Sequence, residues 1–150
     1  MQDKTVLFAT DHAGFELRDF VLEHLRSLGC ALEDMGPQKE KDGDDYPDIM
    51  APLAQRISEE PDKYVGIVMG GSGQGEAMVC NKYPNVRAAV FYGGDEDIVK
   101  LSREHNDANV LSLGARFLSA DQAKKAAELW LATEFPGDER HVRRIEKIDV

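Results

Sequence analysis

The chain lacks the features that mark several specialised classes of protein. None of its apolar runs approaches the length that crosses a membrane, so we expect no membrane partner. Its two cysteines, Cys30 and Cys80, are far apart and form no CxxC pair, so the sequence indicates neither a disulfide framework nor a zinc site. Glycine and proline are not in excess, and apolar residues make up 42% of the sequence. This composition is typical of an ordinary globular protein.

The length and the first residues add two expectations. With 150 residues, the chain fits one domain over residues 1–150, long enough to bury a core. Residues 1–4 run straight into a strand-like segment, so we expect no signal peptide and a cytoplasmic protein.

Positive charge is scarce, with 18 basic against 28 acidic residues and a net charge of −10. Such a surface repels phosphate backbones, so we expect no nucleic-acid partner. An anionic substrate would therefore need basic residues gathered in one place. Arg140 and Arg144 lie four residues apart, on one face of a predicted helix, and two guanidinium groups on one site suit a phosphate. The alternative is a solvated basic helix end, and Arg103 and Arg143 are expected to be ordinary surface residues.

Short apolar segments alternate with helical patterns along the chain. The helices are expected where apolar residues recur at a spacing of three and four, and this alternation predicts a parallel sheet wound on both faces. The predicted strands are 5–9, 32–35, 65–69, 86–90 and 108–113. The predicted helices include 15–28, 49–57, 98–103, 120–131 and a polar C-terminal one at 138–148.

Ligands of open parallel sheets bind beyond the carboxyl ends of the strands. This rule selects four segments, each following a predicted strand. They are Thr10–His12, Gly70–Glu76, Tyr92–Asp95 and Gly114–Arg116.

The segment Gly70–Glu76 holds four glycines, follows a strand and opens a helix. Glycine lets a ligand approach the backbone N–H groups, and a helix N-terminus favours an anion or an oxygen that becomes anionic. The segment does not match a dinucleotide fingerprint, a Walker loop or a nucleophile elbow. The alternative is a tight turn that binds nothing. Glu76 is either a helix-start residue or a base, because the helix dipole would lower its pKa and burial would raise it.

Other polar residues also have two interpretations. Asp11 and His12 could orient a hydroxyl and an anion, although Asp11 would equally cap the next helix. His105 lies among polar residues before a buried strand, and their hydrogen-bonding groups must find partners in the loop or in a ligand. Met78 and Cys80 are expected in the core.

Taken together and in order, these residues resemble the type B ribose-5-phosphate isomerase family, which includes the galactose-6-phosphate isomerase subunits. The resemblance spans nearly the whole chain. Its motifs are Asp11-His12-Ala13-Gly14, Asp45-Tyr46-Pro47, Gly70–Glu76, Asn81-Lys82, Ser102–Leu111, Gly114-Ala115-Arg116 and Arg140-His141 with Arg144.

The resemblance implies an α/β, three-layer Rossmann-like fold with a five-stranded parallel sheet and a C-terminal helix. It also implies that no metal or cofactor is used and that the protein is a homodimer, or a dimer of dimers, with its site at the subunit interface. Many members use a cysteine just before the glycine loop as the base. Gly70 occupies that position here, so the chain resembles the branch whose base is a glutamate, matched by Glu76.

Carried over by position, His105 opens the sugar ring with help from Asp11, and Ser72 with the loop N–H groups binds the substrate oxygens. His12, Arg116 and the two C-terminal arginines hold phosphate. The residues assigned to substrate binding are Asp11, His12, Tyr46, Gly71, Ser72, Gly73, Gln74, Gly75, Asn106, Arg116, Arg140 and Arg144.

The implied reaction is the interconversion of ribose 5-phosphate and ribulose 5-phosphate through an enediolate. Such a reaction needs one base near both carbons and donors for the developing oxyanion. One alternative is isomerisation of another sugar phosphate, such as allose or galactose 6-phosphate or a tetrose phosphate. A non-catalytic phosphosugar-binding module and a subunit that needs a different partner chain are the others.

Overall fold

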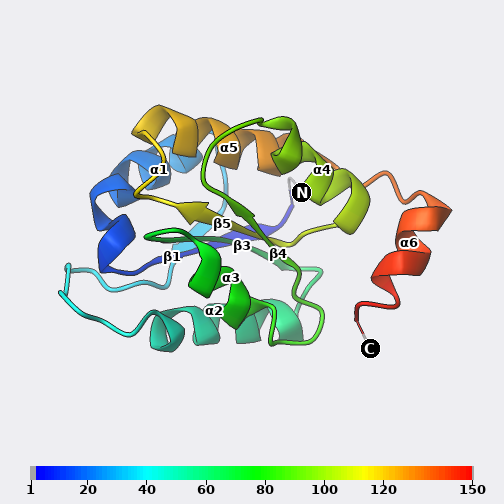
Figure 1. The fold of residues 1–150 in the computed structure, drawn as a ribbon, viewed down its shortest axis with the longest axis horizontal. Helices are drawn as coiled ribbons and strands as arrows, with labels where there is room; N and C mark the ends of the chain where they lie inside the picture. The colour runs from blue at the N-terminus through cyan, green and yellow to red at the C-terminus, as the bar shows by residue number, and fades with distance from the viewer. Residues whose placement is uncertain (1–2, 150) are drawn as a thin grey trace.

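A computed structural model describes residues 3–149 as one parallel five-stranded sheet between two layers of helices (Figure 1). The expected α/β, three-layer Rossmann-like fold is confirmed. The strand order is β2-β1-β3-β5-β4, and every neighbouring pair is parallel. The strands are β1 (Thr5–Thr10), β2 (Leu32–Asp34), β3 (Tyr64–Gly70), β4 (Ala88–Phe91) and β5 (Val110–Gly114).

The central strand β3 shows why apolar residues follow one another along the strand segments instead of alternating with polar ones. All seven of its residues are buried, because helices cover both faces of the sheet. The flanking strands β1 and β5 are buried almost throughout, while β2 and β4 at the two edges are more open.

The helices form one layer on each side of the sheet (Figure 1). One side is covered by α1, α4 and α5, where Trp130 is fully buried against the sheet. The other is covered by α2 and α3, whose apolar side chains pack on Leu7, Val68 and Val110. The helices are η1 (His12–Gly14), α1 (Phe15–Ser27), α2 (Tyr46–Glu59), α3 (Gln74–Cys80), α4 (Asp97–Asn106), α5 (Ala120–Ala132) and α6 (Glu139–Ile145).

The chain leaves the sheet in opposite directions from β1 and β3. From β1 it moves to the edge strand β2, and from β3 it moves to the other half of the sheet. The carboxyl ends of these two adjacent strands are therefore the topological switch point, where open α/β sheets bind ligands. Asp11 follows β1 there, and the glycine loop follows β3.

The short helix α6 lies apart from both layers, beside the end of α4 and at the opposite end of the sheet from the start of α1 (Figure 1). Its buried side chain is His141. Among the described residues, no helix has the length and apolar character needed to cross a membrane.

Two sequence-based expectations about single residues are wrong. Met78 is 64% exposed rather than part of the core, because the one-residue offset from Ala77 turns it to the outer face of α3. Arg103 is only 5% exposed rather than an ordinary surface residue, because its guanidinium group lies over the Trp130 ring and bonds to the end of its own helix.

Candidate active site at the carboxyl edge of the sheet

Asp11 is a buried carboxylate at the end of β1. Its Oδ1 accepts hydrogen bonds from the backbone N–H groups of Ala13 at 2.9 Å and Gly14 at 3.3 Å, so it caps η1. The turn needs glycine at position 14, since a Cβ there would lie 2.2 Å from Thr10 Oγ1. Burial is the main cause that raises the pKa of Asp11, and the two backbone hydrogen bonds oppose it. The capping role and a place in the site are therefore compatible.

His12 is held by Asp44, a residue that no sequence motif singles out. The ring Nδ1 lies 2.6 Å from Asp44 Oδ1, and the His12 backbone N–H donates to the same carboxylate at 3.2 Å. The hydrogen bond to Asp44 raises the pKa of His12, while desolvation and, to a smaller extent, the nearby charge of Arg116 oppose the increase. Because Nδ1 is occupied by Asp44, Nε2 is the ring nitrogen available to a ligand. The only signal in the sequence was one acidic residue among several in a charged loop.

The glycine loop is anchored from the neighbouring strand β5. Ser112 Oγ donates to the carbonyl of Gly73 at 2.6 Å, and Gly73 has a φ of 77°, a left-handed conformation that favours glycine. The backbone N–H of Arg116 donates to the carbonyl of Gly71 at 3.1 Å. Ser72 Oγ accepts from the Gln74 backbone N–H at 3.3 Å. The loop is thus a fixed turn that carries Ser72 and brings Arg116 alongside it.

Glu76 occupies the space beside Gly70. A Cβ built on Gly70 would lie 2.0 Å from Glu76 Oε1 and 2.1 Å from its Cδ, so any side chain at position 70 would collide with this carboxylate. Glu76 is 4% exposed. Burial raises its pKa most, and the negative charge of Asp11 adds to the increase. A buried carboxylate of raised pKa at a strand end is the environment expected of a general base.

The remaining side chains of this edge cover the loop from the outside. The ring of Tyr46, at the start of α2, lies so close to Gly75 that a Cβ there would be 2.6 Å from the ring carbon Cζ. The exposed Arg116 lies against Gly71, where a Cβ would be 3.5 Å from its guanidinium group. Cys80 is fully buried one turn after Glu76, and burial raises the pKa of its thiol to about 12. It is therefore a poor candidate for a base.

The other predicted site residues lie at the opposite end of the strands from the glycine loop, where the amino ends of the strands meet. This side of the sheet is called the amino edge below. His105 and Asn106 end α4, and Asn106 precedes the first residue of β5 by four positions. The glycine loop lies beyond the last residue of β5, so at least the length of that strand, about 13 Å at about 3.3 Å per residue, separates the two groups. The second group is joined by Arg140 and Arg144 on α6, because His141 of this helix stacks on His105 with the ring centroids 4.4 Å apart.

Within residues 3–149, one group of side chains has the composition of a metal site. Asp11, His12 and Asp44 bring potential ligand atoms within 4.8 Å of one another. The hydrogen bond between His12 Nδ1 and Asp44 accounts for much of this proximity. The sequence-based expectation of a reaction without metal stays a prediction.

Comparisons with known proteins agree on one family. The family model described as Ribose/Galactose Isomerase matches residues 6–148. Ribose-5-phosphate isomerase B of Mycobacterium tuberculosis is 34% identical over 146 residues, which is 97% of this chain and 88% of that protein. The crystal structure of ribose-5-phosphate isomerase B from Mycoplasma genitalium with bound ribulose 5-phosphate has a TM-score of 0.92 and 35% identity, and covers 99% of this chain and 95% of that chain. The Thermotoga maritima ribose 5-phosphate isomerase structure has a TM-score of 0.88 and 37% identity over 97% of each chain.

Proposed function

Because the chain belongs to the ribose/galactose isomerase family and is an aldose–ketose isomerase, we propose that it interconverts ribose 5-phosphate and ribulose 5-phosphate with Glu76 as the base. One observation carries the assignment of the base. The buried Glu76 carboxylate fills the space beside Gly70, the position where many family members have a cysteine. The base is thus supplied from a position six residues further along the chain, in the first turn of α3.

The proposed reaction moves one proton between neighbouring carbons. The ionised Glu76 removes the proton from C2 of the open-chain aldose, and the electrons of that C–H bond form the enediolate, whose negative charge develops on O1. Glu76 then returns the proton to C1, and the proton of the C2 hydroxyl passes to O1, which gives the ketose with a carbonyl at C2 and a hydroxyl at C1. Ser72 and the backbone N–H groups of the glycine loop stabilise the developing oxyanion. Burial of the Glu76 carboxylate slows exchange of the carried proton with water without preventing it.

Opening of the furanose ring requires a different group. The ring oxygen must gain a proton while the C1 hydroxyl loses one, and we assign the first role to His105 with help from Asp11. Since the two residues lie at opposite edges of one sheet, a single chain does not bring them together.

The separation of the two groups supports a site shared between two copies of the chain. In this arrangement, the carboxyl edge of one subunit supplies Glu76 and Asp11. The partner supplies His105 and Asn106 from its own amino edge. Phosphate would be bound by His12 and Arg116 of the first subunit and by Arg140 and Arg144 of the second. We propose a homodimer, or a dimer of dimers, in the cytoplasm.

The activity is tested by NMR with the purified chain in deuterated buffer. A panel of pentose, hexose and tetrose phosphates is incubated with and without a strong chelator. We expect the fastest turnover with ribose 5-phosphate, exchange of its C2 hydrogen, and no loss with the chelator. Faster turnover of a hexose 6-phosphate would assign a different substrate, and activity that is lost on chelation and restored by a divalent ion would contradict the proposed mechanism.

The shared site is tested by mixing two inactive variants. A mixed dimer of Glu76→Gln and His105→Ala chains has one site with both changes and one site with neither. Random reassociation therefore restores about a quarter of the parental activity in a two-fold symmetric dimer. If both residues acted within one subunit, the mixture would stay inactive.

A further inference from the structure

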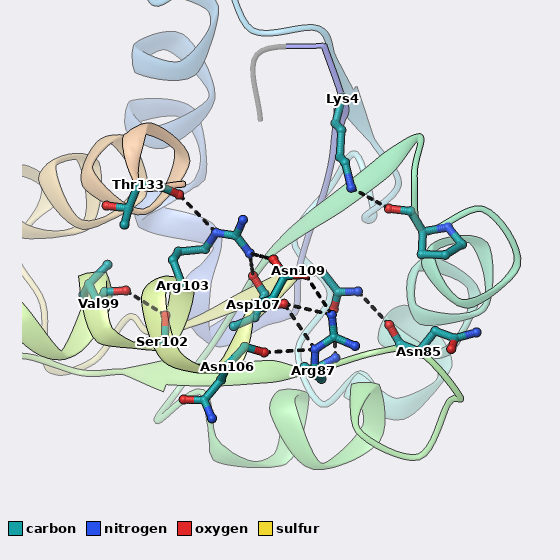
Figure 2. A network of polar contacts seen from close by, with 12 residues as sticks. Lys4, Asn85, Arg87, Val99, Ser102, Arg103, Asn106, Asp107, Asn109 and Thr133 are labelled. Atoms are coloured by element: carbon teal, nitrogen blue, oxygen red, sulfur yellow. Dashed lines mark hydrogen bonds and ion pairs between the residues drawn. The ribbon is translucent and has the colours of Figure 1, made fainter. Parts of the chain in front are cut away.

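The end of α4 is held by Arg87 and Arg103, two arginines of low exposure that both form ion pairs with Asp107 (Figure 2). Arg103 Nη1 donates to Asp107 Oδ1 at 2.7 Å and to the carbonyl of Ala108 at 2.6 Å. Arg87 Nη2 donates to Asp107 Oδ2 at 3.2 Å, and its Nε donates to the carbonyl of Asn106 at 3.0 Å. The carbonyl groups that the end of a helix leaves unpaired are thus bound by cations, which also complement the negative end of the helix dipole.

The same two arginines bind both ends of the segment that contains α6. Arg103 Nε donates to the carbonyl of Thr133 at 3.2 Å, directly after α5 (Figure 2). Arg87 Nη1 lies 2.6 Å from Asp149 Oδ2, after α6. Asp107 joins the two guanidinium groups, so one network ties residues 133 and 149 to the end of α4.

Ending a helix does not require this network. Asp107 has a φ of 43° and a ψ of 45°, the left-handed conformation in which helices most often place a glycine. Glycine would end α4 without two arginines withdrawn from water, an arrangement that is costly unless both charges are paired. What the network adds is a fixed relation between two segments that are 30 residues apart in sequence.

Those two segments carry the second half of the proposed site. His105 and Asn106 directly precede Asp107, and Arg140 and Arg144 lie between the two anchored residues of the C-terminal segment. We propose that Asp107 and its two arginines are positioning residues, which lock the ring-opening and phosphate-binding side chains into one rigid unit. This inference rests on the proposed function, because it assumes that these side chains act on the substrate.

The main test is Asp107→Gly, which introduces the residue type best suited to the left-handed conformation and removes the carboxylate together with the rest of the side chain. A misplacement of about 1 Å can cost about a hundredfold in rate, so we expect kcat/KM for ribose 5-phosphate to fall about ten- to a hundredfold. The loss should appear in both kcat and KM, because ring-opening and phosphate-binding groups are displaced together. Asp107→Asn is the second variant, and Arg87→Lys replaces both if neither folds, since lysine cannot bridge Asp107, Asn106 and Asp149 at once.

The matched control is Arg56→Gln. Arg56 also pairs with a carboxylate and a hydroxyl, Glu33 at 2.5 Å and Tyr64 at 2.8 Å, but contacts neither α4 nor α6. Its loss should lower the melting temperature and leave the kinetics of the folded protein unchanged.

A second readout separates positioning from stability. The chain has four histidines, so the imidazole NMR spectrum of histidine-labelled protein is simple. In the parent, the stacked His105 and His141 should show signals that shift in Asp107→Gly and stay in place in Arg56→Gln. Parental kinetics and parental histidine signals in the Asp107 variants would overturn the inference. If His105→Ala retains parental turnover, the proposed function fails instead, whatever the Asp107 variants do.

Discussion

The two edges of the sheet hold functional side chains in opposite ways. At the carboxyl edge, Asp11 and Glu76 are buried carboxylates placed by tight backbone turns, and burial raises the pKa of each. At the amino edge, the side chains lie at the end of one helix and on another, and a network of ion pairs holds them. The first arrangement makes a carboxylate basic, and the second, in the proposed dimer, presents cations and imidazoles to the partner subunit. In the proposed function, the first edge performs proton transfer, the second opens the sugar ring, and both contribute to phosphate binding.

The largest expected effect comes from a change at the carboxyl edge alone. Glu76→Gln keeps the size of the side chain but cannot accept a proton, and loss of a positioned general base typically costs about 10²–10⁴-fold in rate. We expect kcat to fall by this factor, with a much smaller change in KM, and exchange of the C2 hydrogen to stop. Steady-state kinetics and NMR in deuterated buffer measure both. Near-normal exchange in the variant would assign the base to another group.

The next largest effect comes from a change at the amino edge, and it depends on whether the substrate forms a ring. His105→Ala should lower the turnover of ribose 5-phosphate by about a hundredfold, the lower end of the range for a lost acid or base. A four-carbon sugar 4-phosphate cannot close the corresponding ring, so its turnover should change much less. The comparison uses the two rates in parent and variant. Equal losses on both substrates would move His105 from ring opening to proton transfer between the carbons.

The phosphate-binding residues on α6 should show a smaller effect, mainly in KM. Removing one charged hydrogen-bonding partner costs about 1.5–3 kcal/mol. Arg140→Ala and Arg144→Ala should therefore each raise KM for ribose 5-phosphate about 10- to 150-fold, with some loss in kcat because remote binding also orients the sugar. Arg143→Ala on the same helix is the control. Parental KM values in both variants would return this helix to the status of a solvated basic segment.

The contact between His12 and Asp44 should make substrate affinity depend on pH. Because the hydrogen bond to Asp44 raises the pKa of His12, the imidazole stays cationic to a higher pH than an ordinary histidine, and Arg116 opposes this only in part. Phosphate binding should weaken as pH rises through that raised pKa. In Asp44→Asn the weakening should begin at a lower pH. KM measured across neutral and mildly alkaline pH shows the shift. Coincident pH profiles of KM in the parent and in Asp44→Asn would contradict a role of Asp44 in setting the charge of His12.

The smallest effect concerns stability. Because its pKa is raised, the Glu76 carboxyl group binds its proton more tightly in the folded protein than in the unfolded chain. The free energy of unfolding therefore falls as pH rises from the ordinary glutamate pKa through the raised one. Glu76→Gln should therefore melt at a higher temperature than the parent at neutral pH, and the difference should vanish near pH 4. Thermal melts at both values provide the measurement. A lower melting temperature at neutral pH would show that the carboxylate makes a net favourable contact.

The carboxyl edge could be predicted from the sequence because strand ends and glycine spacing locate it. Asp11, the glycine loop and Arg116 follow strands directly, so the parallel topology alone brings them to one edge. The residue pattern alone does not decide the role of Glu76, since only the structure shows that its carboxylate fills the space at Gly70.

The amino edge was much harder to predict. His105 and Arg140 are 35 positions apart, and only packing brings α6 onto the end of α4. The sequence pattern predicts Arg103 as a surface residue, although its spacing of four to Asp107 is a usable signal for an ion pair at a helix end. Asp44 carried no periodic signal, because its partner His12 is brought near by the path of a long loop.

The collision between Glu76 and any side chain at position 70 has a consequence for the chemical vulnerability of the enzyme. Peroxide and electrophilic inhibitors attack thiolates, and accessible thiols of low pKa react most readily. In this chain the space of the reactive cysteine is filled by a carboxylate, and the nearest thiol, Cys80, is sealed in the core with its pKa raised to about 12. A relative that used a cysteine at that position as its base, as the family resemblance implies for many members, would expose its catalytic atom to oxidation. With Glu76 as the proposed base, proton transfer involves no thiol, and the enzyme should keep working under oxidising conditions that inactivate a cysteine-based isomerase.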